Sequence, residues 1–150
     1  RLKSLQDRLI LTLYLKATPM KQRIAYFAVV VKDYDEAIQF YTKKLHFQLL
    51  EDTPLDPVKR WVRVAPPGSE ECGILLAKAK NERELAAVGN QSGGRVFLFL
   101  YTDDLDRDYQ NLVNHEIEIV RPISEHDYGR VLVFADLYGN LWDLIEPTKK

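Results

Sequence analysis

The sequence has three histidines, and one of them stands in a favourable place for acid, base or metal chemistry. His126 lies in the segment Glu125-His126-Asp127-Tyr128-Gly129, which is predicted to be a loop just before a strand. Histidine titrates near neutral pH and binds metals, so His126 is a candidate acid, base or metal ligand. An ordinary surface loop is the simpler interpretation of the same residues. His46 and His115 are instead expected at the ends of helices and are interpreted as capping residues.

Three arginines, Arg60, Arg63 and Arg130, fall on segments that are predicted to be middle strands of a sheet. A guanidinium that points inward from such a strand binds a carboxylate or phosphate through charge-assisted hydrogen bonds. A guanidinium that points outward is a solvated surface charge. The strand register decides between these interpretations, and Arg63 and Arg130 are taken as candidate pocket residues.

Aromatic side chains alternate along two predicted strands. Successive residues of a strand point to opposite faces, so Tyr26, Ala28 and Val30 share one face of the first strand. The corresponding face of the other strand carries Phe97, Phe99 and Tyr101. Such a surface suits a planar or mostly apolar ligand, whereas the alternative is that these aromatic side chains form plain core.

The composition is that of an ordinary globular protein. Of the 150 residues, 46% are apolar and 29% are charged, which suffices for one domain or for two half-size modules that share a core. Basic and acidic residues nearly cancel, 21 against 22, so no broad positive field favours nucleic acid or an anionic membrane. The single cysteine, Cys72, excludes an intrachain disulfide and fits a reducing cytoplasm. We therefore expect a soluble cytoplasmic protein that binds neither nucleic acid nor membranes.

Residues 1–19 have a different pattern and are predicted to form a helical extension. Leu2, Leu5, Leu9 and Leu13 recur at helical spacing. The apolar run is too short to span a bilayer, which needs about 20 residues, and no small-residue cleavage site of a signal peptide follows it. We expect this helix to pack on the domain or on a partner chain.

The remainder divides into two modules with the same order of elements, residues 20–88 and 95–150. A strand comes first, then a helix capped by Asp33 or Asp104, then three more strands. The predicted strands span 24–31, 47–51, 59–65 and 73–78 in the first module, and 95–102, 117–121, 130–135 and 141–146 in the second. Tyr26 and Phe97 are separated by as many residues as Asp33 and Asp104, which indicates an internal duplication. Residues 89–94 are rich in glycine and are interpreted as a flexible linker.

Both ends of this repeat resemble one family. The run from Ile24 to Tyr41, with Lys44-Leu45-His46-Phe47 behind it, is similar to the opening of glyoxalase, bleomycin-resistance and extradiol-dioxygenase proteins. The run from Phe134 to Pro147 resembles the closing hairpin of the same vicinal-oxygen-chelate superfamily. The resemblance implies an α+β fold in which two tandem βαβββ modules form a curled eight-stranded mixed sheet, a cup, with helices on the outer face.

The same resemblance implies where a metal would be held, on the first and last strands of each module. Those positions carry Tyr26, Leu75, Phe97 and Asp143, and only Asp143 supplies a ligand. Because a catalytic divalent site needs about three oxygen or nitrogen ligands, no metal site and no cofactor are expected. Asp143 is instead a candidate general base or hydrogen-bond anchor, unless its carboxylate pairs with a nearby arginine or with Tyr26.

The leading hypothesis is a small-molecule-binding protein whose ligand contacts Tyr26, Leu75, Phe97, Phe99, Tyr101, Arg63 and Arg130. A metal-dependent lyase, isomerase or dioxygenase of the same superfamily is the first alternative, and a non-catalytic dimerisation module is the second. A homodimer is expected in each case, because the open sheet edges of this superfamily commonly pair across a two-fold axis.

Overall fold

The computed structural model describes residues 4–17, 20–69 and 71–150. Leu2 and residues 18–19 of the predicted N-terminal extension lie outside these ranges. The first part of the chain contains α1 (Leu5–Ala17), β1 (Tyr26–Val31), α2 (Tyr34–Gln39), the π-helical turn η1 (Phe40–Lys44), β2 (Gln48–Pro54), β3 (Arg60–Ala65), β4 (Gly73–Lys78) and α3 (Glu82–Ala87). The second part contains β5 (Val96–Tyr101), α4 (Leu105–Asn114), β6 (Ile119–His126), β7 (Gly129–Ala135) and β8 (Leu141–Pro147). The predicted tandem order of strand, helix and three strands is confirmed.

The eight strands of the two modules form two mixed sheets of four strands each. Their orders are β1-β4-β3-β2 and β5-β8-β7-β6. In each sheet the first and last strands of the module run parallel, and the other neighbours are antiparallel. The prediction of one eight-stranded sheet is wrong in this respect, because each module's first strand pairs with its own last strand and remains an edge strand.

The two helices begin at the predicted aspartates. The Asp33 carboxylate accepts hydrogen bonds from the backbone N–H groups of Asp35 and Glu36 at 2.9 and 3.0 Å. The Asp104 carboxylate accepts one from the N–H of Arg107 at 2.9 Å. These bonds satisfy amide groups that the first turn of a helix leaves without an intrahelical partner. Local sequence signals therefore fix the start of both helices.

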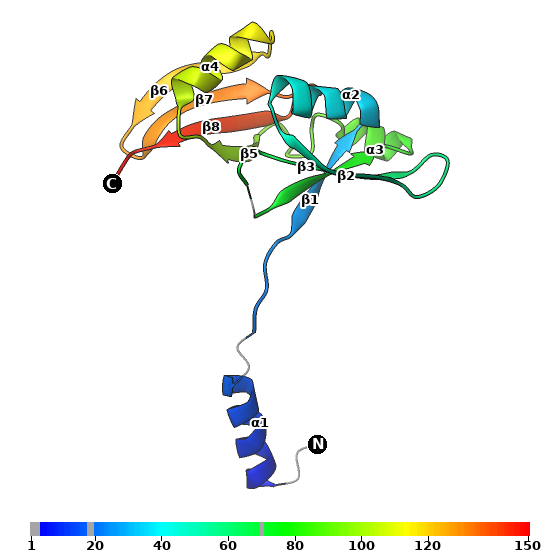
Figure 1. The fold of residues 1–150 in the computed structure, drawn as a ribbon, viewed down its shortest axis with the longest axis vertical. Coiled ribbons are helices and arrows are strands. Elements are labelled where there is room, and N and C mark those ends of the chain that lie inside the picture. Colours follow the sequence, from blue (N-terminus) through cyan, green and yellow to red (C-terminus); the bar gives the residue numbers. More distant parts are fainter. Residues whose placement is uncertain (1–3, 18–19, 70) are drawn as a thin grey trace.

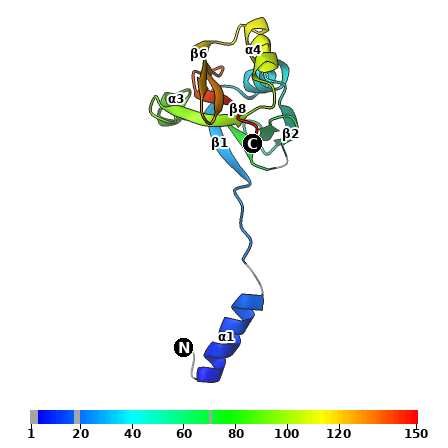
Figure 2. The same cartoon turned by 90° about the vertical axis from the view of Figure 1, so that its left-hand side faces the viewer.

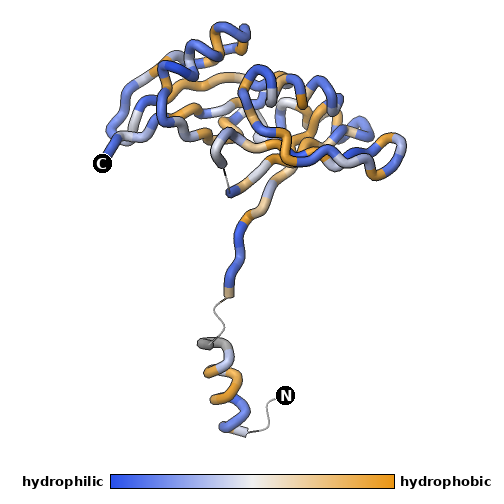
Figure 3. Tube along the Cα trace, in the orientation of Figure 1, coloured by the Kyte–Doolittle hydropathy of each residue, from blue (hydrophilic) through white to orange (hydrophobic). Residues whose placement is uncertain are grey.

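Helices α2 and α4 cover the same side of the two sheets (Figure 1). Between them lies one shared hydrophobic core, to which both modules contribute. At its centre four aromatic rings pack together, with centroids 5.6 to 6.1 Å apart: Tyr41, Phe47, Phe134 and Trp142. Apolar residues are concentrated along the strands, and polar residues lie on the outward turns of the helices (Figure 3).

A buried carboxylate joins the modules at this core. Asp136, in the turn between β7 and β8, is 6% exposed and accepts a hydrogen bond from the Tyr41 hydroxyl at 2.7 Å. Burial, followed by the charge of Asp136, raises the pKa of Tyr41 well above its ordinary value, so this hydroxyl remains a donor. The side chain of Asn140 and its backbone N–H also donate to Asp136, at 2.9 and 3.0 Å.

The segment that was interpreted as a flexible linker is fixed at two points. Gly89 has φ +74°, and a Cβ placed there would lie 1.8 Å from the carbonyl oxygen of Tyr138. The side-chain amide of Gln91 accepts a hydrogen bond from Val30 N–H at 2.7 Å and donates one to Ala28 O at 3.2 Å. The Gln91 amide thus occupies the free edge of β1, where another strand would otherwise pair.

Helix α1 stands apart from both sheets, beyond an extended segment of residues 20–25 (Figures 1 and 2). Residues Leu5–Ala17 form this helix, which lies away from both sheets, and packing on a partner chain stays a prediction. Leu5, Leu9 and Leu13 are all more than half exposed. In the part of the chain that the structure describes, no helix is long and apolar enough to cross a membrane.

Candidate functional site

The side of each sheet opposite α2 and α4 is called here the open face. In the first sheet, Ala28 pairs with Leu75, and Leu75 pairs with Arg63, so these three side chains lie in one row across this face. Alternation along the strands adds their neighbours on the same face: Tyr26, Val30, Trp61 and Ala77. The intervening residues point into the shared core, where Val29, Val62 and Leu76 are buried.

Strands β3 and β4 separate toward one end of the first sheet. Their pairing covers three residue pairs, from Val64 with Ile74 to Val62 with Leu76. Beyond that point β4 continues along β1, and β3 continues along β2. The sheet is therefore split at this end.

The side chain of Tyr34, from the first turn of α2, lies at the split. Its hydroxyl accepts a hydrogen bond from the backbone N–H of Arg60 at 3.2 Å. The Arg60 guanidinium lies over the Tyr34 ring, 5.2 Å from its centroid, and is held there by Asp35 and Asp52. Arg60 is thus committed to these contacts rather than available to a ligand.

A pocket of about 630 Å³ lies where the two strands separate. Its apolar lining includes Val30, Trp61, Leu75 and Ala77, and its polar rim includes Asp56, Lys59, Arg60, Lys78, Lys80 and Glu84. Pockets that bind small molecules are typically 300 to 1,000 Å³, with mostly apolar walls and a few polar groups. Leu75, a predicted pocket residue, is part of this lining.

Tyr26 and Arg63 lie on the same open face, beside this pocket. The Tyr26 ring meets the Trp61 ring edge-on with centroids 5.9 Å apart, and the Arg63 guanidinium lies 5.5 Å from the Tyr26 centroid. Arg63 also forms an ion pair with Glu51 at 3.0 Å. Sequence reasoning missed Trp61, although its place two residues before Arg63 on one strand is the signal that would have indicated it.

The open face of the second sheet carries two exposed aromatic side chains. Phe99 and Tyr101 are 66% and 72% exposed. Phe97 does not accompany them, because the register of β5 against β8 shifts between Val96 and Leu98. The Phe97 ring instead packs against the core, with its centroid 6.4 Å from that of Phe27. Strict alternation therefore fails at this bulge.

Asp143 lies beside Phe99 and Val133 in the second sheet. Burial raises the pKa of its carboxyl above the ordinary value of 3.8, and the positive charge of Arg121 partly opposes this shift. Among the residues that the structure describes, no hydrogen bond or ion pair is formed by the Asp143 side chain. The lining of the pocket in the first sheet includes neither Asp143 nor Phe97.

The remaining predicted residues, His126 and Arg130, lie elsewhere. His126 is the last residue of β6 rather than a loop residue; its ring stacks on Tyr128 at 5.0 Å and its Nε2 lies 2.8 Å from the Ser124 hydroxyl. The Arg130 guanidinium binds Asp106 at 2.7 Å and Glu146 at 3.3 Å. Arg130 thus ties α4 to the sheet. Within residues 4–17, 20–69 and 71–150, no group of three or more His, Cys, Asp or Glu side chains is arranged to hold a metal.

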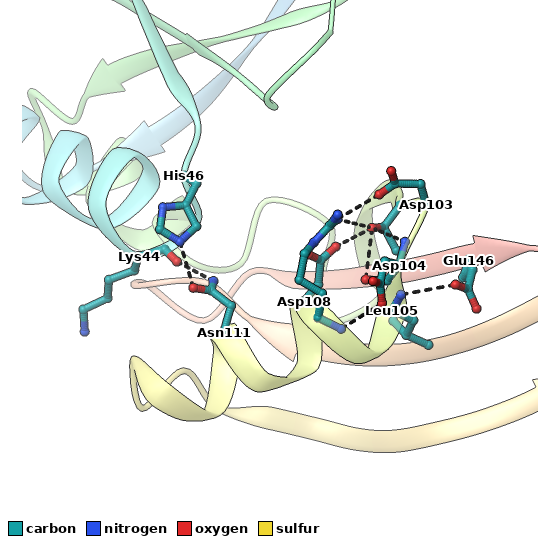
Figure 4. Close-up of polar contacts among 10 residues, drawn as sticks. Lys44, His46, Asp103, Asp104, Leu105, Asp108, Asn111 and Glu146 are labelled. Atoms are coloured by element: carbon teal, nitrogen blue, oxygen red, sulfur yellow. Dashed lines mark hydrogen bonds and ion pairs between the residues drawn. The ribbon is translucent and has the colours of Figure 1, made fainter.

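A second hollow, of about 500 Å³, lies between the modules on the helix-covered side. Its polar groups bind one another (Figure 4). The Asn111 side chain donates to Lys44 O at 2.7 Å, which leaves its oxygen to accept from His46 Nε2 at 2.9 Å. Arg107 pairs with Asp103 and Asp108 at 2.8 and 2.9 Å. We interpret this hollow as a joint between the modules, because its charged side chains pair with one another. We interpret the pocket in the first sheet as the candidate site, because Lys59 and Lys78 in its lining form no ion pair with the residues that the structure describes.

Comparison with known proteins identifies the family of the chain. Residues 23–144 match the family described as the Glyoxalase/Bleomycin resistance protein/Dioxygenase superfamily. An uncharacterized protein of Shewanella frigidimarina (strain NCIMB 400) is 55% identical over 132 residues, covering 87% of this chain and 98% of that protein.

Solved structures give the same result. The crystal structure of TnmS3, described as an antibiotic binding protein from Streptomyces sp. CB03234, matches with TM-score 0.70 and 27% identity, covering 87% of this chain and 100% of that one. A glyoxalase/bleomycin resistance protein from the same organism matches with TM-score 0.65 and 29% identity, covering 82% of this chain and 99% of that one. The chain therefore belongs to the glyoxalase, bleomycin-resistance and dioxygenase superfamily.

Proposed function

We propose that this protein binds a small planar or largely apolar molecule in the pocket on the open face of its first sheet. The observation that carries the proposal is the pocket of about 630 Å³ with Trp61 and Leu75 in its lining. Binding is favourable here because a ligand that covers such an apolar surface removes it from water, which lowers the free energy of the complex. The similar protein TnmS3 is described as antibiotic binding, which supports the same class of function.

The metal centre that this superfamily implies does not fit the residues present. At the expected positions, Tyr26 and Leu75 lie on the first sheet, Phe97 packs into the core, and Asp143 alone carries a carboxylate. We therefore derive no chemical step through a metal. Asp143, with its raised pKa, is proposed as a general base or hydrogen-bond anchor that faces the ligand after assembly of the complete site.

We propose further that two copies of the chain pair to close the site. Phe99 and Tyr101 present exposed aromatic surface on the open face of the second sheet, and β5 is a free edge strand. A second copy that covers these groups would bury apolar area and form a cup from two open faces.

A titration with N-phenyl-1-naphthylamine, a neutral planar probe, tests the binding proposal. We expect saturable quenching of tryptophan emission in the wild type and loss of saturation in Leu75→Arg, which places a charge in the pocket lining. Leu137→Arg is the matched control, because Leu137 is 42% exposed in the turn after β7. Circular dichroism of both variants confirms that they fold. Quenching that is absent, or equal in both variants, would contradict the proposal.

Metal analysis separates the proposal from the alternative of a metal-dependent lyase, isomerase or dioxygenase. The protein is purified without chelator, its metal content is measured, and thermal shifts are recorded with nickel, zinc, manganese and iron. A stoichiometric metal ion that is lost in Asp143→Asn would favour a metal-dependent enzyme and would contradict the proposal of a binding site without a metal.

A further inference from the structure

The rim of the pocket carries more positive than negative side chains. Its charged lining residues are four cations, Lys59, Arg60, Lys78 and Lys80, and two acids, Asp56 and Glu84. A ligand that enters the pocket therefore meets a net positive rim, whose attraction salt screens because Lys59, Lys78 and Lys80 are exposed.

Two of these cations already have partners. Arg60 binds Asp35 and Asp52, and Lys80 lies 3.9 Å from Glu84. Lys59 and Lys78 form no ion pair with any residue in the described part of the chain. These two ammonium groups are the uncommitted charges of the rim.

Asp56, the other acid of the rim, is hydrogen-bonded within the turn before β3. Asp56 accepts hydrogen bonds from the backbone N–H groups of Val58 and Lys59 at 2.8 and 2.6 Å. These bonds hold its pKa below the ordinary value, so the carboxylate stays charged but faces the turn. The positive charge of Lys59 also lowers the pKa of Asp56, but no ion pair holds the Lys59 or the Lys78 ammonium group to a residue in the described part of the chain.

The floor adds one more donor without a partner. Trp61 lines the pocket, and its indole N–H makes no hydrogen bond to the residues that the structure describes. Around it the surface is apolar, with Val30, Leu75 and Ala77. The free polar groups of the pocket are therefore donors and cations, and the free surface is flat and apolar.

We propose that the ligand is a planar molecule that carries an anionic group, with its ring system on Trp61 and its anion toward Lys59 and Lys78. This inference rests on the proposed function of the same pocket and specifies the chemical class of the ligand. A carboxylate, a sulfonate and a phosphate satisfy the same groups, because each offers charged acceptor oxygens to ammonium donors.

Two probes with the same rings test the charge. 1-Anilinonaphthalene-8-sulfonate carries a sulfonate, and N-phenyl-1-naphthylamine lacks it. Both are titrated into the chain of residues 1–150 at low salt, with quenching of tryptophan emission as the readout; the same titration of Trp61→Phe measures the part of the quenching that comes from Trp142. We expect the sulfonate probe to bind about fivefold to tenfold more tightly, since each partly exposed ion pair contributes a small factor. The advantage should shrink as salt is added.

Substitution of Lys59 and Lys78 tests whether the difference in affinity between the two probes comes from the rim of the pocket. In the double variant Lys59→Gln, Lys78→Gln the affinities of the two probes should become nearly equal. The matched control is Lys43→Gln, Lys149→Gln, which removes two exposed lysines outside the pocket lining and should keep the wild-type ratio. Trp61→Phe identifies the fluorescence signal as that of the pocket.

The outcomes separate this inference from the function on which it rests. If both probes bind the wild type equally, or the neutral probe binds more tightly, the anionic ligand is ruled out and the binding function stands. An affinity ratio unchanged in Lys59→Gln, Lys78→Gln would also overturn the inference. If neither probe quenches Trp61, the proposed function itself fails.

Discussion

The Tyr34 hydroxyl accepts a hydrogen bond from the backbone N–H of Arg60 at 3.2 Å, in the place where a neighbouring strand would otherwise supply a carbonyl. This contact joins the first turn of α2 to the start of β3, beyond the last residue pair that β3 forms with β4. The pocket lies where the two strands are no longer paired, and Tyr34 is one of its lining residues. A side-chain hydrogen bond therefore borders the candidate site.

Removal of that hydroxyl in Tyr34→Phe should destabilise the protein and weaken probe binding. The Arg60 N–H loses its acceptor, and an unsatisfied backbone donor that is partly buried costs about 1 to 2 kcal/mol. Urea denaturation measures this loss of unfolding free energy. Tyr101→Phe is the control, because Tyr101 is 72% exposed and its hydroxyl makes no hydrogen bond to the residues described. Equal stability of the two variants would contradict the role given to Tyr34.

The raised pKa of Asp143 predicts a pH-dependent stability. Burial favours the protonated carboxyl in the folded state, so ionisation of Asp143 costs stability above its folded-state pKa. The cost disappears when the pH is below the pKa of the carboxyl in the unfolded chain, near 3.8, because the carboxyl is then protonated in both states. Asp143→Asn should therefore be more stable than wild type at pH 7, and the difference should vanish below about pH 3.8.

A second variant checks the cause of this shift. The positive charge of Arg121 lowers the pKa of Asp143, so Arg121→Gln should raise that pKa further. Titration of the Asp143 carboxyl by NMR measures both values. A pKa of Asp143 at or below 3.8 in the wild type would refute the argument.

The linker offers a matched pair of glycines. Gly89 and Gly93 both have positive φ, +74° and +66°, so either substitution to alanine strains the backbone by about 1 to 2 kcal/mol. A Cβ at Gly89 would also lie 1.8 Å from Tyr138 O, whereas nothing lies within 4 Å of one at Gly93. Gly89→Ala should thus cost about 1 to 3 kcal/mol more than Gly93→Ala in chemical denaturation. Equal costs would mean that the linker does not pack on the turn after β7.

Sequence patterns predicted the parts of the fold that depend on near neighbours. The caps at Asp33 and Asp104 and the repeated order of elements are local signals, and the structure confirms them. The strand predicted at 117–121 instead spans Ile119–His126, because two register shifts against β7 let it run past the expected end. Such shifts depend on pairing with another strand and leave no trace in periodicity.

The candidate site was harder to predict because its parts come together only in three dimensions. Strand alternation placed Tyr26 on one face of its strand, the family resemblance pointed to Leu75, and Arg63 was a candidate from its place on a middle strand; the structure puts all three side chains on the open face of the first sheet. Phe97 was misplaced, because a bulge in β5 breaks the alternation. The contact of Tyr34 at the split depends on a hydrogen bond between residues far apart in the sequence, which no local pattern encodes.

The exposed aromatic pair on the second sheet leads to a prediction about assembly. A flat apolar surface that carries Phe99 and Tyr101, at 66% and 72% exposure, is typical of a contact site. We expect the wild type to be a dimer at micromolar concentration by size exclusion with light scattering, and Phe99→Glu to be a monomer, because burying an unpaired carboxylate in an interface is costly. Tyr128→Glu is the control, since Tyr128 is 59% exposed on the hairpin between β6 and β7 and should leave the dimer intact. A monomeric wild type would remove the basis for a cup built from two copies, and the pocket of the first sheet would then have to bind its ligand alone.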